Sequence, residues 1–115
     1  MEPLSARQRR FTRLLADLIV HAYDHLGVEL TLGEVWRPTA LAEYYQGRGC
    51  GIVDSLHIVR LAADLCVFKD GVYQVDPEAY RAMGEYWEGQ APECNWGGRF
   101  GDSNHFSYSA GDGRR

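Results

Sequence analysis

The stretch from Asp54 to Val75, DSLHIVRLAADLCVFKDGVYQV, contains the clearest strand pattern of the chain. Leu61–Phe68 has the composition of a core strand, and the KDG turn signal followed by VYQV predicts its hairpin partner. Asp64 lies in the middle of that strand, where desolvation of an unpaired carboxylate is costly or forces it to protonate. We therefore expect Asp64 to have a partner, and His57, seven residues earlier, is the first candidate.

Apolar residues at helical spacing predict one amphipathic helix before this hairpin and another after it. Ser5 and Gln8 form a capping-box pattern at the start of the first helix, and Gly27 ends it. Asp76 and Pro77 form an N-cap and first-turn pair for the second helix. The apolar positions of the first helix are Phe11, Leu14, Leu15, Leu18, Ile19, Ala22 and Leu26, and those of the second are Tyr80, Met83, Tyr86 and Trp87.

The remaining segments are shorter and less regular. Val28–Leu32 is β-prone, and Pro38–Gly51 has the polar, glycine-rich composition of a long loop with one helical turn at Leu41–Tyr45. From Gly89 the chain is irregular until a last short strand at His105–Ser109. This order of elements predicts a small single domain of the α+β class, with helices packed on a mostly antiparallel sheet.

Length and composition agree with one domain. The chain has 115 residues, of which 45% are hydrophobic and 24% charged, so we expect one core within residues 1–109 and a disordered tail at residues 110–115. The net charge of −4 argues against a nucleic-acid partner. Since no signal peptide and no membrane-spanning apolar run is visible, we expect a cytoplasmic product without stable membrane association.

The cysteines do not predict a metal or disulfide framework. Cys50, Cys66 and Cys94 are odd in number and lack CxxC spacing, which favours ordinary reduced thiols. Strand alternation places Cys66 on the same face of its strand as Asp64.

A second cluster, GDSNHF, changes the interpretation of Asp64. It places Asp102 three residues before His105, a spacing that lets both side chains serve one site. A catalytic zinc site requires three protein ligands and a nearby carboxylate that takes a proton from water. His57, Asp64 and His105 would be the three ligands and Asp102 the base. The alternative is a satisfied core histidine beside a hydrogen-bonded aspartate.

The segments SLHIVRLAADL and WGGRFGDSNHF resemble the paired motifs of the M15 family of zinc peptidases, SxHxxGxAxD and WGG…DxxHF. That family includes D-Ala-D-Ala carboxypeptidases and dipeptidases, and phage endolysins that cut the L-alanyl-D-glutamate bond of peptidoglycan. The opening RQRRFTRLLADLIVHAYDHLGVELTLGEVWR and the segments FKDGVYQ and EAYRAMGEYWE also resemble small phage members, so the likeness covers nearly the whole chain. It implies a hedgehog/DD-peptidase-like fold.

The resemblance assigns roles to individual positions. His57, Asp64 and His105 fall on the zinc ligands, and Asp102 falls on the general base. Arg37 falls on the arginine that contacts the substrate or its developing oxyanion, although a surface arginine after a strand is the alternative.

Three further motif positions have weaker implications. Ser55 falls on the serine of SxH and either contacts substrate or caps a turn, and Trp96 heads the WGG segment and either contacts substrate or lies in the core. Arg60 departs from the motif, which has glycine there. We expect this position not to require a left-handed backbone and the arginine to point outward.

The resemblance implies a zinc-dependent peptidoglycan peptidase. Asp102 in DxxH, where carboxypeptidases and dipeptidases of this family tend to have glutamate, favours an endolysin that hydrolyses the L-alanyl-D-glutamate bond of the stem peptide. Such a protein would be a monomer in the bacterial host cytoplasm and would act on the cell wall after release. The alternatives are a D-alanyl-D-alanine carboxypeptidase and a catalytically inactive, zinc-containing binding module like hedgehog. Asp102 and Arg37 argue against the module, since a structural zinc requires neither.

Overall fold

The hairpin strand that contains Asp64 is the central strand of the sheet. In the computed structural model, which describes residues 2–49 and 55–109, this strand is β2 (Ala62–Lys69), and the strand order is β1-β2-β5-β4. β3 also pairs with β2, and every pairing is antiparallel. The remaining strands are β1 (Glu29–Leu32), β3 (Val72–Tyr73), β4 (Cys94–Trp96) and β5 (His105–Tyr108).

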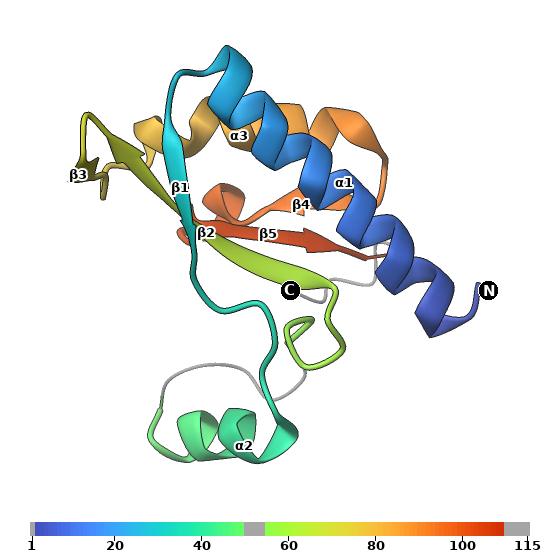
Figure 1. Ribbon diagram of the computed structural model, residues 1–115. Helices are drawn as coiled ribbons and strands as arrows, with labels where there is room; N and C mark the ends of the chain where they lie inside the picture. Colours follow the sequence, from blue (N-terminus) through green and yellow to red (C-terminus); the bar gives the residue numbers. More distant parts are fainter. Residues whose placement is uncertain (1, 50–54, 110–115) are drawn as a thin grey trace.

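Two long helices, α1 (Leu4–His25) and α3 (Glu78–Gln90), lie together over one face of the sheet, and α2 (Thr39–Gly47) stands apart from them (Figure 1). The apolar stripes that predicted α1 and α3 are the faces that they bury. Trp87 is fully buried and donates its indole N–H to the Ser107 carbonyl at 3.0 Å, which ties α3 to β5. The buried core includes Leu18 and Ala22 of α1, Leu65 and Val67 of β2, Met83 and Trp87 of α3, and Phe106 of β5. The predicted α+β architecture is confirmed.

The boundaries of α1 and α3 agree with the sequence except at the start of α1. The capping-box prediction is wrong, because α1 begins at Leu4 with Pro3 as its N-cap, so Ser5 already lies inside the first turn. Gln8 instead donates its side-chain amide to the Val59 carbonyl at 2.8 Å. The predicted start of α3 is supported by the Asp76 carboxylate, which accepts a hydrogen bond from the Glu78 N–H at 3.0 Å.

Two short elements differ from the prediction. The expected single helical turn at Leu41–Tyr45 is a nine-residue helix, α2, which follows Pro38 at its N-cap. The segment Cys94–Trp96, predicted to be irregular, is β4 and pairs with β5. Its alternating burial is the signal of a strand, but three residues are too few for that pattern to be recognised.

Arg60 corrects another expectation. Its φ is +57°, so the backbone is left-handed at this position. The Leu61 N–H bonds to the Leu56 carbonyl at 2.9 Å and the Arg60 N–H to the His57 carbonyl at 3.3 Å. This pair of bonds closes a helical turn with a left-handed residue at its end, a position that favours glycine. The Arg60 guanidinium lies 4.4 Å from the centre of the Trp36 ring, and that contact offsets part of the strain.

Among the described residues, none of the helices combines the length and the apolar composition that a bilayer span requires. The predicted tail at residues 110–115 and Cys50 lie outside the described residues.

Candidate metal centre

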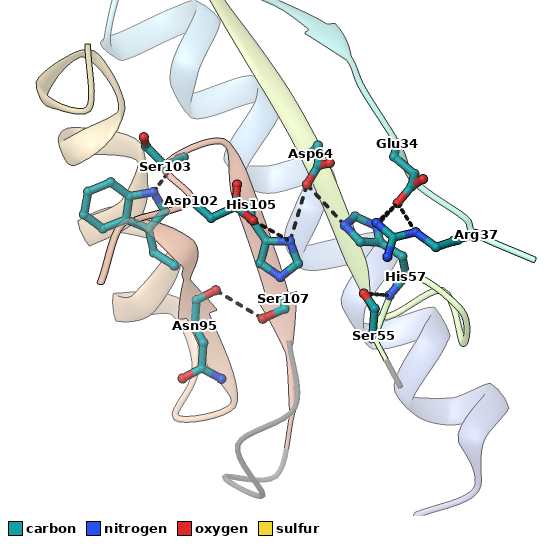
Figure 2. A network of polar contacts seen from close by, with 11 residues as sticks. Glu34, Arg37, Ser55, His57, Asp64, Asn95, Asp102, Ser103, His105 and Ser107 are labelled. Carbon is teal, nitrogen blue, oxygen red and sulfur yellow. Dashed lines mark hydrogen bonds and ion pairs between the residues drawn. The ribbon is translucent and has the colours of Figure 1, made fainter. Parts of the chain in front are cut away.

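The register of the sheet brings two of the predicted ligands together. Asp64 of β2 pairs directly with His105 of β5, and residues opposite one another in an antiparallel pair point to the same face. Ala63 and Leu65, the neighbours of Asp64, point into the core, so Asp64 and His105 lie on the face turned away from α1 and α3. The turn that precedes β2 carries His57 to the same place (Figure 2).

Three side-chain atoms converge at this face. His57 Nε2 lies 3.2 Å and His105 Nδ1 lies 3.4 Å from Asp64 Oδ1. Together these residues offer three ligand atoms within 4.8 Å of one another. A tetrahedral zinc ion about 2.0–2.2 Å from each ligand atom places those atoms about 3.4 Å apart. The two separations from Asp64 Oδ1, 3.2 and 3.4 Å, are close to that spacing.

The hydrogen bonding of Asp64 supports the same interpretation. His57 and His105 are only 2% and 3% exposed. Among the described residues, His57 Nδ1, Asp64 Oδ1 and His105 Nε2 are buried and have no hydrogen-bond partner. Buried polar atoms in native proteins are nearly always satisfied. A metal ion would satisfy Asp64 Oδ1, whereas the two unpartnered ring nitrogens are those that do not face Asp64. His57, Asp64 and His105 thus form a possible metal-binding triad.

Asp64 is held in its ionised form. Burial raises the pKa of this carboxyl, but the adjacent His105 and His57 side chains together outweigh burial and lower the pKa to about 2. An ionised carboxylate is the form that binds a metal. This arrangement answers the question raised by the sequence, because the charged residue within the strand has two histidine partners.

Arg37 lies beside the triad and not on an open surface. Its side chain is 13% exposed, and its backbone N–H bonds to the His57 carbonyl at 3.1 Å. Its guanidinium Nε donates to Glu34 Oε1 at 2.8 Å, and the same oxygen lies 3.8 Å from His57 Nδ1 (Figure 2). Glu34 was missed by the sequence analysis. The only signal was its i, i+3 spacing to Arg37, which is common on protein surfaces.

Asp102 lies at the rim of the triad. Its side chain is 54% exposed, and its Oδ2 is 3.9 Å from His105 Nδ1. The loop between β4 and β5, which carries Asp102, is held by two backbone hydrogen bonds. The Asp102 N–H donates to the Gly97 carbonyl, and the His105 N–H donates to the Asp102 carbonyl. A Cβ at Gly97 would lie 2.2 Å from that Asp102 carbonyl oxygen, so the close approach of the loop requires glycine.

The other two predicted contacts lie deeper. Ser55 is buried, and its Oγ accepts a hydrogen bond from the His57 N–H at 3.3 Å, as a turn-capping serine does. Trp96 is 2% exposed and donates its indole N–H to the Ser103 carbonyl at 2.7 Å. The predicted substrate contact of Trp96 is not supported by this placement, which instead makes the tryptophan a core residue that holds the loop carrying Asp102.

The two described cysteines are free thiols. Cys66 is half-buried on the Asp64 face of β2, as alternation predicted, and Cys94 lies in the core. Burial, with a smaller contribution from the Glu93 charge, raises the pKa of Cys94 to about 12.

Comparison with known proteins identifies the fold. No family model matches the chain, and no curated protein matches it in sequence. Among solved structures, the chain is similar to ChiX, an L-Ala D-Glu endopeptidase of Serratia marcescens, with a TM-score of 0.68 and 20% sequence identity. The similarity covers 88% of this chain and 79% of that chain. It confirms the predicted class, a small α+β domain with helices on an antiparallel sheet.

Proposed function

We propose that this protein is a zinc-dependent peptidase of the M15 type that hydrolyses the L-alanyl-D-glutamate bond of the peptidoglycan stem peptide. The observation that carries the proposal is the convergence of His57, Asp64 and His105, whose ligand atoms lie within 4.8 Å of one another. Asp64 Oδ1, at the centre of this group, is buried and lacks a hydrogen-bond partner among the described residues. The paired motifs of the sequence and the similarity of the fold to an L-Ala D-Glu endopeptidase support it independently.

The residues around the triad suit peptide hydrolysis. A zinc ion bound there would supply a Lewis acid that polarises a carbonyl and lowers the pKa of water. Asp102, exposed at the rim and near His105, would take the proton of the attacking water and return it to the leaving amine. Arg37, held beside His57, would stabilise the negative oxygen that develops on the substrate carbonyl.

Asp102 also favours one bond over the others. In the family that the motifs resemble, aspartate in DxxH is typical of endolysins. The fold neighbour is named as an enzyme acting on L-Ala D-Glu. We therefore propose that the substrate is the stem peptide of the bacterial cell wall and that the protein acts there in lysis.

Digestion of purified peptidoglycan tests this proposal. We expect the zinc-loaded protein to create new free amines on D-glutamate, with L-alanine left on the muramic acid side, as identified by mass spectrometry of the fragments. Asp102→Ala protein, loaded with zinc in the same way, is the matched control and should create few new termini.

Other products would point to the rival functions. Free D-alanine as the only product would identify a D-alanyl-D-alanine carboxypeptidase. An intact, zinc-bound protein that cleaves nothing would favour the inactive binding module.

A further inference from the structure

Glu34 directs one carboxylate oxygen at two functional residues. Its side chain is 25% exposed, and Oε1 lies 2.8 Å from Arg37 Nε and 2.5 Å from another guanidinium nitrogen of Arg37. The same oxygen lies 3.8 Å from His57 Nδ1 (Figure 2). Glu34 thus stands between the arginine and one of the three candidate metal ligands.

His57 requires a hydrogen-bond acceptor on this side. Its Nε2 faces Asp64 and is the nitrogen placed to bind a metal. A neutral imidazole that binds metal through one nitrogen carries its proton on the other, here Nδ1. That atom is buried and has no hydrogen-bond partner among the described residues. A buried N–H without an acceptor costs about 1–3 kcal/mol.

Glu34 is placed to accept that hydrogen bond. The separation of 3.8 Å between Glu34 Oε1 and His57 Nδ1 is longer than a normal hydrogen bond. A rotation of the Glu34 or His57 side chain can bring the two atoms within hydrogen-bond distance. The backbone around Glu34 is tied to the metal face of β2. The Asp64 N–H bonds to the Glu34 carbonyl, and the Gly33 N–H bonds to the Asp64 carbonyl, each at 2.8 Å.

We propose that Glu34 is a positioning residue that accepts the Nδ1 proton of metal-bound His57 while it holds the Arg37 guanidinium. Metal-binding histidines commonly donate their second N–H to a carboxylate, which fixes the ring and strengthens metal binding. The His57 contact depends only on metal binding, whereas the Arg37 contact rests on the proposed peptidase function. Glu34 would then align the metal centre with the group that stabilises the oxyanion.

A measurement of zinc affinity distinguishes a hydrogen bond from His57 to Glu34 from a simple ion pair between Glu34 and Arg37. We expect Glu34→Ala to weaken zinc binding about 10-fold or more, measured by competition with a chelator of known affinity. Glu34→Gln should retain part of the affinity, because its amide oxygen can still accept the hydrogen bond. Arg37→Ala should bind zinc no more weakly than the wild type. Glu29→Gln, an exposed carboxylate on β1, is the matched control and should also bind zinc normally.

The outcomes distinguish this inference from the proposed function. If Glu34→Ala and Glu34→Gln bind zinc as tightly as the wild type, the positioning role is wrong and the peptidase proposal stands. If the wild type binds no zinc, both proposals are overturned.

A second measurement is the turnover of peptidoglycan at saturating zinc. In this assay Glu34→Ala should have a lower kcat than the wild type, and the kcat of Glu34→Gln should lie between the two. Equal kcat values for the wild type and Glu34→Ala would contradict the alignment of Arg37.

Discussion

At the scale of single residues, the surroundings of Asp64 follow from elementary electrostatics. A carboxylate within an apolar strand needs compensating partners, and His57 and His105 supply them within 3.4 Å. The arrangement leaves Asp102 in a different environment, because its side chain is half exposed and lies at the rim. Two aspartates near one site therefore have separate roles available to them, one as a ligand and one as a base.

The division of roles predicts the behaviour of Asp102→Ala. Because Asp102 lies outside the triad and its side chain is 54% exposed, its loss should leave zinc content and thermal stability nearly unchanged. Activity on peptidoglycan should fall about 10²-fold or more, the usual contribution of a general base. Metal analysis, thermal unfolding and a turnover assay on the same preparation check this. Loss of zinc from the variant would make Asp102 a ligand and contradict the assignment.

Residue chemistry also sets how much of the site the sequence could predict. His57, Asp64, Asp102 and His105 could be found because their residue types are unusual in those positions and their motifs are specific. Glu34 could not, because a glutamate near an arginine is common, and only the folded chain shows what it faces. The left-handed backbone of Arg60 could not be predicted either, because the sequence does not show which residue of a turn takes that conformation.

At the scale of elements, the position of the site depends on how β4 and β5 pack against α3. Trp96 of β4 lies against Gly84 of α3, and a Cβ at Gly84 would lie 2.1 Å from the Trp96 ring. The indole then holds the loop that carries Asp102 through its hydrogen bond to Ser103. A small residue on α3 therefore supports the loop that carries Asp102.

Substitution of Gly84 tests this packing. Gly84→Ala should destabilise the protein by about 1–3 kcal/mol, since the methyl group must displace a buried ring. Gly89→Ala on the same helix is the control, because nothing lies within 4 Å of its Cβ position. That change should be stabilising by up to about 1 kcal/mol, from helix propensity. Urea unfolding measures both, and equal stability of the two variants would contradict the packing argument.

The sequence predicted best those elements that have a long periodic pattern or a clear turn signal beside them. α1, α3 and β2 contain enough residues for a periodic pattern, and all three were found. β4 has three residues and α2 begins in a polar, glycine-rich stretch, so neither had a recognisable period. β4 is held by its pairing with β5, a contact that exists only in the folded chain.

At the scale of the whole molecule, the two faces of the sheet differ in what they carry. The face under α1 and α3 holds the apolar core, and the opposite face carries the candidate metal centre. The three candidate ligands come from the turn before β2, from β2 and from β5, so they meet only when the central strands pair in the observed register. The candidate metal centre is therefore a property of the complete fold and not of one local motif.

Zinc stoichiometry of the ligand variants tests the central claim most directly. Protein purified without chelator should contain about one zinc per chain, and His57→Ala and His105→Ala should each lose most of it. Circular dichroism of the same samples should show that the variants remain folded. Folded His57→Ala and His105→Ala proteins that retain a full equivalent of zinc would contradict the metal centre described here.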